Sequence, residues 1–397
     1  MRRSAVVGGW ACLVLVAGLL AGCTSEPGSG GTGGQGAPSS ATAEVAKPVT
    51  IATVPATGAS DIAPGEPVSV TASDGRLTEV TLRNPAGEVV PGVLAADGGS
   101  WEFTDGLGYG KQYTLTAVAV GADGKPVTST STFTTIGKPR RTISVSLNMQ
   151  EGETVGVGMP LIFTFSSKVT DRQAAERALK VATEPVTEGA FRWTRDDTVI
   201  WRPKDYWRPG TKISVDAAIY GKPLGGGAYG LEDRAASVTV GDKVTVVADG
   251  GSHQLTVSVN DAEVRTMPIS MGKPGHTTPA GTYTVMSEHV GYTMDSGTYG
   301  VPADTPGGYR TFVKYAVRLS NSGIFYHSAP WSVGSQGHRN VSHGCINLSN
   351  DNAKWLMDLS KKGDLFTVTN SGGQQLEPTD GWSVWQLPWP AWTTPTT

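Results

Sequence analysis

Apolar and polar residues alternate over many short stretches of this 397-residue chain. A period of two is typical of half-buried β-strands, and Gly-containing turn pairs separate the stretches. The stretches 65–71 and 110–117 are echoed by 158–164 and 210–217, about one hundred residues further on. We therefore expect two similar modules, each built from several short strands.

The size and strand content of these modules favour immunoglobulin-like β-sandwiches. We assign the first to residues 47–138 and the second to residues 139–241, with Trp101 of the first corresponding to Trp201 of the second. Neither module contains a Cys pair, so packing alone has to stabilise their cores. Residues 171–181 predict one helix within the second module. We interpret both modules as a stalk, because neither shows a ligand site.

The pattern changes in the segment 242–370. Six stretches there predict strands, at 243–247, 254–259, 263–267, 281–286, 310–319 and 364–368. Ser349 is a favourable N-cap residue, and apolar residues at helical spacing continue to Ser360. Residues 291–308 have no periodicity, and a loop of that length in a compact domain is usually functional. We expect a β-rich domain with one main helix and a lid.

The last segment, residues 371–397, is rich in tryptophan. It contains Trp382, Trp385, Trp389 and Trp392. Four exposed indole rings would be unfavourable, so we expect this tail to fold back and dock. The predicted fold class is therefore mainly β, with two immunoglobulin-like modules, a β-rich domain and a Trp-rich C-terminal tail.

The chain begins with the pattern of a secretory signal. Arg2 and Arg3 precede an apolar run over residues 5–20, which is short for a membrane span. The run closes with Leu-Ala-Gly-Cys at 20–23, which resembles the bacterial lipobox. In a lipobox the cysteine receives a diacylglyceryl group and becomes the mature N-terminus, which here would be Cys23.

From this pattern we expect residues 1–22 to be removed as a signal peptide. Residues 23–46, which are rich in Gly and Ser, would form a flexible tether. The protein would then be anchored by its N-terminal lipid to the outer face of the cytoplasmic membrane, facing the cell wall.

The amino-acid composition, the net charge and the cysteine count exclude further classes of protein. Charged residues make up 17% of the chain, with 52 Gly and 25 Pro, which favours short strands and turns over a helical cytosolic enzyme. The net charge of −3 provides no clustered basic footprint for nucleic acid. Of three cysteines, Cys12 would leave with the signal and Cys23 would carry lipid. Cys345 then has no disulfide partner, and either burial or chemistry must account for it.

The segment around Cys345 predicts nucleophilic chemistry. A thiol needs a nearby base or a positive environment, and His327 follows a stretch at 323–326 that predicts a strand able to hold its imidazole. Gly344 permits a tight turn, and backbone N–H groups beside the nucleophile would receive a developing oxyanion. Cys345 also lies shortly before the predicted helix, whose dipole would modestly favour the thiolate.

His327, fourteen further residues and Ser342-His343-Gly344-Cys345-Ile346-Asn347 together resemble the signature of the L,D-transpeptidases, with their YkuD-type catalytic domain. The lid sequence at 294–302, continuing to 308–310, also resembles that of this family. The order of segments (signal peptide, two modules, catalytic domain and Trp-rich tail) resembles that of actinobacterial L,D-transpeptidase lipoproteins of the mycobacterial type-2 kind. The resemblance covers the whole mature chain.

The resemblance implies a cysteine-dependent acyltransferase of peptidoglycan biosynthesis. Cys345 would attack the meso-diaminopimelate carbonyl of a donor tetrapeptide and release D-Ala. The diaminopimelate amine of a second stem peptide would resolve the thioester, giving a 3→3 cross-link. No cofactor or metal is implied, and carbapenems would acylate the same cysteine.

The resemblance also assigns roles to individual residues. His327 would be the general base, oriented by the carbonyl of Ser328, and the amides of Gly344 and Cys345, together with His343, would form the oxyanion hole. Residues that would hold the donor are Tyr309, Ser322, Gly323 and Asn347. Residues that would line the lid and the entrance are Met294, Tyr299 and Trp331.

Other interpretations stay open at this point. A hydrolase acting as an L,D-carboxypeptidase could use the same site, because water and the acceptor amine compete for one thioester. His343 could equally be a scaffold residue, and the lid residues could be ordinary packing. Zinc ligation by His327, His338, His343 and Cys345 matches no common spacing. A non-catalytic surface lipoprotein is the third alternative.

The order of residues disfavours other families of cysteine enzymes. Papain-like and NlpC/P60 enzymes place Cys before His, whereas here His327 precedes Cys345. Sortases need an Arg after the Cys, and no Arg follows Arg339.

Overall fold

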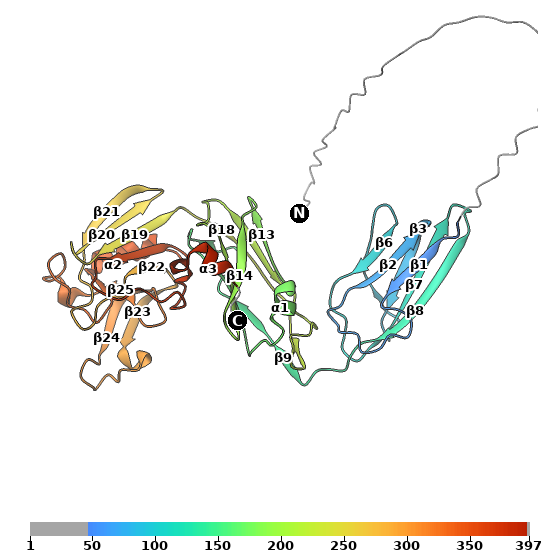
Figure 1. Ribbon diagram of the computed structural model, residues 1–397, viewed down its shortest axis with the longest axis horizontal. Coiled ribbons are helices and arrows are strands. Elements are labelled where there is room, and N and C mark those ends of the chain that lie inside the picture. The colour runs from blue at the N-terminus through green and yellow to red at the C-terminus, as the bar shows by residue number, and fades with distance from the viewer. Residues whose placement is uncertain (1–46, 395–397) are drawn as a thin grey trace, which may run out of the picture. The chain divides into compact units, whose positions relative to one another are not determined.

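The computed structural model describes residues 47–394, apart from the side chain of Tyr299 (Figure 1). This part of the chain is mainly β, which confirms the predicted fold class. The predicted signal peptide, Cys23 and the tether lie outside the described residues. Among the residues that are described, no helix is long and apolar enough to cross a membrane.

The first module consists of two four-stranded antiparallel sheets around one core. One sheet has the order β1 (Thr50–Val54), β2 (Val68–Ser73), β6 (Ser100–Phe103), β5 (Val93–Leu94). The other has the order β4 (Val89–Val90), β3 (Gly75–Arg83), β7 (Gln112–Gly121), β8 (Pro126–Thr134). Leu82, Trp101 and Leu115 come from both sheets and are buried in the shared core.

The second module also has two four-stranded sheets around one core, which are antiparallel except for one parallel pair of strands. One sheet has the order β10 (Val145–Leu147), β12 (Leu161–Phe165), β15 (Thr198–Pro203), β14 (Gly189–Arg195). The other has the order β11 (Thr154–Val155), β18 (Arg234–Val240), β16 (Lys212–Ala217), β13 (Leu179–Glu184), and β9 (Arg141–Ile143) pairs with β17 (Ala228–Gly230). β11 and β18 form the parallel pair. Trp201, like Trp101, is buried in the core.

The helix predicted in the second module is present but shorter than expected. α1 spans Arg172–Ala178, and the side chain of Asp171 caps it by accepting a hydrogen bond from the backbone N–H of Ala174. It ends at Ala178 because β13 begins at the next residue and pairs with β16. Sequence periodicity overestimated the helix because buried residues continue into that strand.

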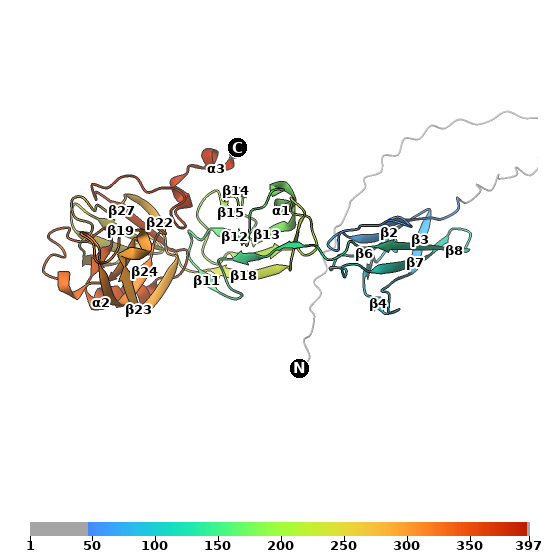
Figure 2. The same ribbon diagram turned by 90° about the horizontal axis from the view of Figure 1, so that it is seen from below.

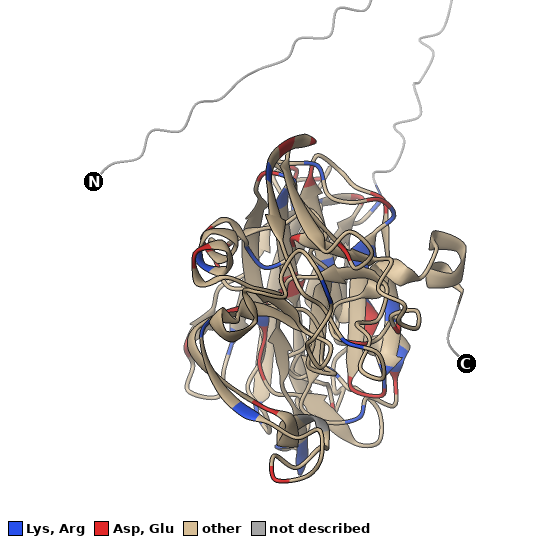
Figure 3. Cartoon of the chain, turned by 90° about the vertical axis from the view of Figure 1, so that its left-hand side faces the viewer, with Lys and Arg blue, Asp and Glu red and all other residues tan. Residues whose placement is uncertain are grey.

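The third domain contains two sheets that share a core. A five-stranded sheet has the order β21 (Ala262–Pro268), β20 (Gln254–Val259), β19 (Val244–Asp249), β27 (Leu365–Thr369), β22 (Gly281–Thr284). A four-stranded sheet has the order β23 (Ser287–Asp295), β24 (Arg310–Arg318), β25 (Phe325–Ser328), β26 (Ile346–Leu348). Figure 2 shows β19, β22 and β27 side by side. Acidic and basic residues are interspersed on the side of the chain drawn in Figure 3.

All six strands predicted in this domain are present, with ends shifted by up to two residues. The boundary of the lid was wrong, because β23 continues to Asp295 and pairs with β24, with Asp295 opposite Arg310. Val290, Tyr292 and Met294 alternate along β23, but Val290 is exposed and Met294 is the one buried side chain of the strand, so this short alternation did not stand out. The connection between the paired strands therefore begins with a short 3₁₀ helix at Ser296–Tyr299.

The main helix has the predicted boundaries. α2 spans Asn350–Leu359, Ser349 caps its first turn by accepting from the N–H of Asn352, and Ser360 ends it. Its buried residues, Ala353, Leu356 and Met357, belong to the shared core, and the helix packs against β24, β25 and β26. α2 thereby supports the strands that carry the chemistry described below.

The Trp-rich tail packs on the second module through Arg202 of β15. The tail contains a 3₁₀ helix at Val384–Gln386 and α3 at Trp389–Thr393. The Arg202 guanidinium lies 4.8, 5.5 and 4.8 Å from the ring centroids of Trp385, Trp389 and Trp392, and it donates to the carbonyl of Leu387. Burial lowers the pKa of Arg202 to about 10, so the side chain stays charged at neutral pH.

We expect Arg202→Ala to weaken the packing of the tail on the second module and to lower the free energy of unfolding by about 3 kcal/mol. The substitution opens a cavity, removes the cation–π contacts and leaves the Leu387 carbonyl unpaired. Urea unfolding followed by tryptophan fluorescence measures the effect. Arg195→Ala is the matched control, because Arg195 is 73% exposed and pairs only with Asp197. Equal midpoints for the two variants would contradict the assignment.

Candidate active site

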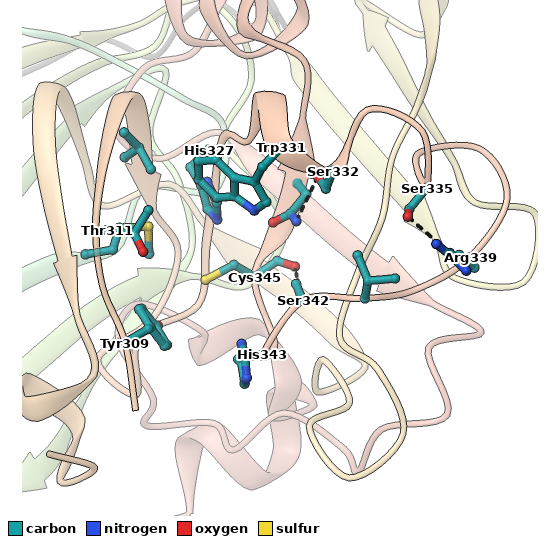
Figure 4. Close-up of a pocket in the computed structure, with 14 residues that line it drawn as sticks. Tyr309, Thr311, His327, Trp331, Ser332, Ser335, Arg339, Ser342, His343 and Cys345 are labelled. Carbon is teal, nitrogen blue, oxygen red and sulfur yellow. Dashed lines mark hydrogen bonds between the residues drawn. The ribbon is translucent and has the colours of Figure 1, made fainter. Parts of the chain in front are cut away.

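A cavity of about 380 Å³ opens beside β24, β25 and the segment that leads into β26 (Figure 4). It brings together residues that are far apart in the sequence. The lining residues are Met294, Tyr309, Thr311, Val313, His327, Trp331, Ser332, Ser335, Arg339, Val341, Ser342, His343, Cys345 and Asn347.

Strand pairing places His327 beside Cys345. β25 and β26 are parallel neighbours, with Tyr326 opposite Ile346 and His327 opposite Asn347. Cys345 directly precedes β26, so its side chain enters the cavity next to the imidazole, as Figure 4 shows. The strand expected at 323–326 lies at 325–328, so His327 is a strand residue rather than the residue that follows one.

His327 is oriented by its own strand. Only 5% of the residue is exposed, and its Nδ1 lies 3.1 Å from the carbonyl oxygen of Ser328. A carbonyl only accepts, so Nδ1 carries the proton and Nε2 keeps its lone pair. Burial lowers the pKa of His327 to about 4, an effect that the Ser328 hydrogen bond only partly opposes. The imidazole is therefore a neutral base at neutral pH.

Cys345 is also neutral in this structure. The residue is 6% exposed, and its thiol donates to the carbonyl oxygen of Gly323 over 3.4 Å. Burial raises the pKa of the thiol to about 11. The expectation that a helix dipole favours the thiolate was wrong, because β26 separates Cys345 from the first residue of α2 and the dipole acts only near the terminal turn.

Two hydroxyl groups fix the loop that carries the thiol. Ser342 Oγ donates to the Cys345 carbonyl over 2.6 Å and accepts from the Gly344 N–H over 3.1 Å. Thr278 Oγ1 donates to the Gly344 carbonyl over 2.7 Å. Gly344 has φ +123°, a conformation that residues with a Cβ rarely adopt. The Gly344 amide, expected to face an oxyanion, is thus hydrogen-bonded to Ser342 here.

His343 lies at the exposed edge of the cavity. Its Nε2 is 3.2 Å from the Lys273 ammonium, which can only donate, so the proton of the neutral ring is on Nδ1. Burial, and then the positive charges of Lys273 and His276, lower the pKa of His343. The ring contacts His276 and Tyr309, with centroids 4.9 and 5.6 Å away. His276 had no role in the sequence-based hypothesis.

Four of the seven residues expected to contact substrate line the cavity. Met294 is buried, Tyr309 is half-buried and Trp331 is exposed, while the Asn347 amide donates to Ser332 Oγ. The side chain of Tyr299 lies outside the described residues.

Ser322 and Gly323 do not line the cavity. Ser322 donates through its backbone and its hydroxyl to the carboxylate of Asp380, whereas Gly323 offers its carbonyl to the thiol.

Sequence reasoning missed several cavity residues. Thr311 and Val313 alternate on one face of β24, and this period of two could have identified them. Arg339 lies between His327 and Cys345, but no motif marked it as a cavity residue. Thr278, which bonds to the Gly344 carbonyl, comes from a distant segment and gave no local signal. Among residues 47–394, no three His, Cys, Asp or Glu side chains cluster as metal ligands.

Comparisons with known proteins agree with this geometry. The family model described as the L,D-transpeptidase catalytic domain matches residues 243–369, and the model described as a bacterial Ig domain matches residues 59–223. The latter match runs through most of both predicted modules.

Relatives and solved structures extend the similarity. The chain is 45% identical over 335 residues to L,D-transpeptidase 2 of Mycobacterium tuberculosis, covering 84% of this chain and 82% of the relative. It is 37% identical over 347 residues to L,D-transpeptidase 5 of the same species, covering 85% and 75%. The structure of the L,D-transpeptidase LdtMt1 in complex with imipenem has 41% identity and a TM-score of 0.50, covering 58% of this chain and all of that one. This chain belongs to the L,D-transpeptidase family.

Proposed function

We propose that this protein joins peptidoglycan stem peptides by 3→3 cross-links between meso-diaminopimelate residues, through a thioester on Cys345. One observation carries the proposal: a buried thiol and a neutral imidazole with a free Nε2 lone pair share one cavity. The family membership supports the acyl-transfer reaction.

In the first half-reaction the donor carbonyl, linked to D-Ala, enters the cavity beside the thiol. Because thiol and imidazole both rest neutral, the Sγ proton moves to Nε2 of His327 as the bond from Sγ to carbon forms. The thiol leaves its hydrogen bond to Gly323 in this step. The imidazolium then protonates the departing D-Ala amine, the amide C–N bond breaks, and a thioester remains on Cys345.

In the second half-reaction the amine of an acceptor diaminopimelate attacks the thioester. His327 Nε2 accepts a proton from this amine as the new amide bond forms, the bond from Sγ to carbon breaks, and the imidazolium returns the proton to Sγ to regenerate the thiol. One amide is broken for each amide made, so no nucleotide is consumed. The cross-link follows from an amine replacing D-Ala on the same carbonyl.

The oxyanion formed in each half-reaction needs backbone donors. We assign this role first to the Cys345 amide, since Ser342 Oγ holds the Gly344 amide in the resting site. The Gly344 amide can contribute only if it leaves Ser342. His343, held neutral and bonded to Lys273, then positions the loop and the Tyr309 ring rather than supplying charge.

Incubation of the purified protein with a disaccharide-tetrapeptide tests the proposal. We expect a dimer whose tandem mass spectrum shows a link between two diaminopimelate residues, with release of one D-Ala for each link. Release of D-Ala and a tripeptide, without dimer even at high acceptor concentration, would instead support the L,D-carboxypeptidase alternative.

The pH dependence of acylation follows from the two shifted pKa values. A depressed His327 pKa means that the base stays available until the pH falls towards about 4, and a thiol pKa near 11 means that no thiolate forms around pH 8. We therefore expect the rate of acylation by a carbapenem to be nearly constant from about pH 6 to about pH 9 and to fall below about pH 5. Intact-mass time courses measure it, with circular dichroism to verify folding. An inflection near the ordinary histidine pKa of about 6.5 would contradict the neutral-pair assignment.

We also propose that Cys23 carries the lipid that anchors the protein outside the cytoplasmic membrane. The support is the sequence alone: two Arg, an apolar run and the lipobox-like end at Cys23. The mass of the mature N-terminal peptide tests it, because an unmodified cysteine or cleavage elsewhere would refute the anchor.

A further inference from the structure

Among the described residues that line the cavity, Arg339 is the one with a permanent charge. The two histidines of the cavity are neutral, and none of its lining residues within 47–394 is Asp or Glu. Figure 4 shows Arg339 at one end of the cavity, with Thr311 and Tyr309 at the other and Cys345 between them. A ligand that spans the cavity would therefore meet a positive charge at a defined distance from the thiol.

The loop around Arg339 is held in place by hydrogen bonds. Arg339 Nε donates to Ser335 Oγ over 3.1 Å, and its backbone N–H donates to the Ser335 carbonyl over 2.9 Å. Ser270 Oγ donates to the Arg339 carbonyl over 2.8 Å, and Gln336 Nε2 donates to Ser332 Oγ over 3.2 Å. Arg339 is exposed, and the Nε contact restrains its guanidinium beside the Ser335 hydroxyl.

Arg339 forms no ion pair with any acidic residue among residues 47–394. Arg310, on the lid side of the cavity, is different, because it pairs with Asp295 over 3.3 Å. A guanidinium beside a cavity, oriented by a hydroxyl and unmatched by an internal carboxylate, has the geometry that recognises a carboxylate of a ligand.

We propose that Arg339 and Ser335 form a carboxylate-binding subsite that selects the donor stem peptide. This inference rests on the proposed function. A tetrapeptide donor carries one carboxylate on its terminal D-Ala and another at the side-chain end of diaminopimelate. Either one is a planar group that can accept two N–H hydrogen bonds from a guanidinium. Arg339 acts on binding and on donor choice, because it stands apart from the thiol and transfers no proton.

Donor kinetics test the subsite. The full-length protein and its Arg339→Gln and Arg339→Lys variants are assayed for D-Ala or D-alaninamide release with four tetrapeptides, in which each of the two carboxylates is either free or a carboxamide. Lys354→Gln is the charge-matched control, because Lys354 is exposed on α2 and pairs only with Asp358. Acylation by a carbapenem, measured by intact mass, reports whether the active site of each variant is assembled.

We expect wild-type protein to prefer the donor with the recognised carboxylate by about ten- to a hundredfold in kcat/KM. Arg339→Gln should lose this preference through a raised KM, with kcat within about twofold, and Arg339→Lys should restore part of it. The carboxylate that Arg339 binds is the one whose conversion to a carboxamide lowers kcat/KM for the wild type but not for Arg339→Gln.

Two results would overturn the inference: equal losses on all four donors, which mark a structural role, or no change in donor preference. Wild-type protein that accepts a carbapenem but releases D-Ala or its amide from none of the four donors would refute the proposed function itself, and the subsite with it.

Discussion

Cys345→Ser is expected to abolish covalent modification of the protein by a carbapenem. Wild-type protein should gain the mass of one inhibitor molecule, whereas the variant should show no adduct over the same period. The reason is chemical: a hydroxyl is far less nucleophilic than a thiol, and a base with a pKa near 4 cannot activate it. Intact-mass spectrometry measures the result, and the complex of LdtMt1 with imipenem makes imipenem a suitable inhibitor.

The matched control for this experiment is Lys354→Gln, which should form the same single adduct as wild type. The variant at Cys345 should keep the wild-type unfolding midpoint, because a serine hydroxyl is similar in size to the thiol and can donate to the same Gly323 carbonyl. An adduct of unchanged stoichiometry on the Cys345→Ser protein would mean that another group is the nucleophile.

His327→Gln is expected to slow acylation by about 10²- to 10⁴-fold at neutral pH. Without Nε2 as acceptor, the reaction depends on thiolate formed in solution, and the thiol pKa near 11 makes this species scarce. The variant should therefore recover about tenfold in rate for each unit of rising pH, while wild type stays nearly flat. Stopped time courses between pH 6 and pH 10 measure both slopes.

The control variant here is His289→Gln. His289 lies in the same domain, with Nε2 2.9 Å from Ser287 Oγ, but it does not line the cavity. Its acylation rate should match that of wild type. A His327→Gln protein with a flat pH profile would show that the imidazole does not take the thiol proton.

Local sequence patterns were sufficient for much of the fold. Alternation identified six strands of the third domain, because their apolar side chains face one core, and the cap at Ser349 marked the start of α2. The pairing of His327 with Cys345 was also predictable as a hypothesis, since the motif and its spacing are specific. The structure adds the parallel pairing of β25 and β26, which brings the two side chains together.

Other features depend on tertiary surroundings that a local pattern does not contain. The neutral state of the thiol results from burial, which overrides any influence of the later helix. β23 was missed because Met294 is its one buried side chain, and the strand is recognised mainly by its pairing with β24. Thr278 reaches the site from a distant segment, whereas Arg339 lies only six residues before Cys345, and the fold is what shows that it lines the cavity.

A stem peptide is expected to become a thioester on Cys345 before it is joined to a second stem. The most direct measurement is the mass of the Cys345 peptide after rapid acid quenching of the protein with a tetrapeptide donor alone. We expect an adduct equal to the donor without D-Ala, which hydroxylamine removes and which added acceptor converts into 3→3 dimer. Dimer formation without any adduct on Cys345, or an adduct that acceptor never discharges into dimer, would contradict this expectation.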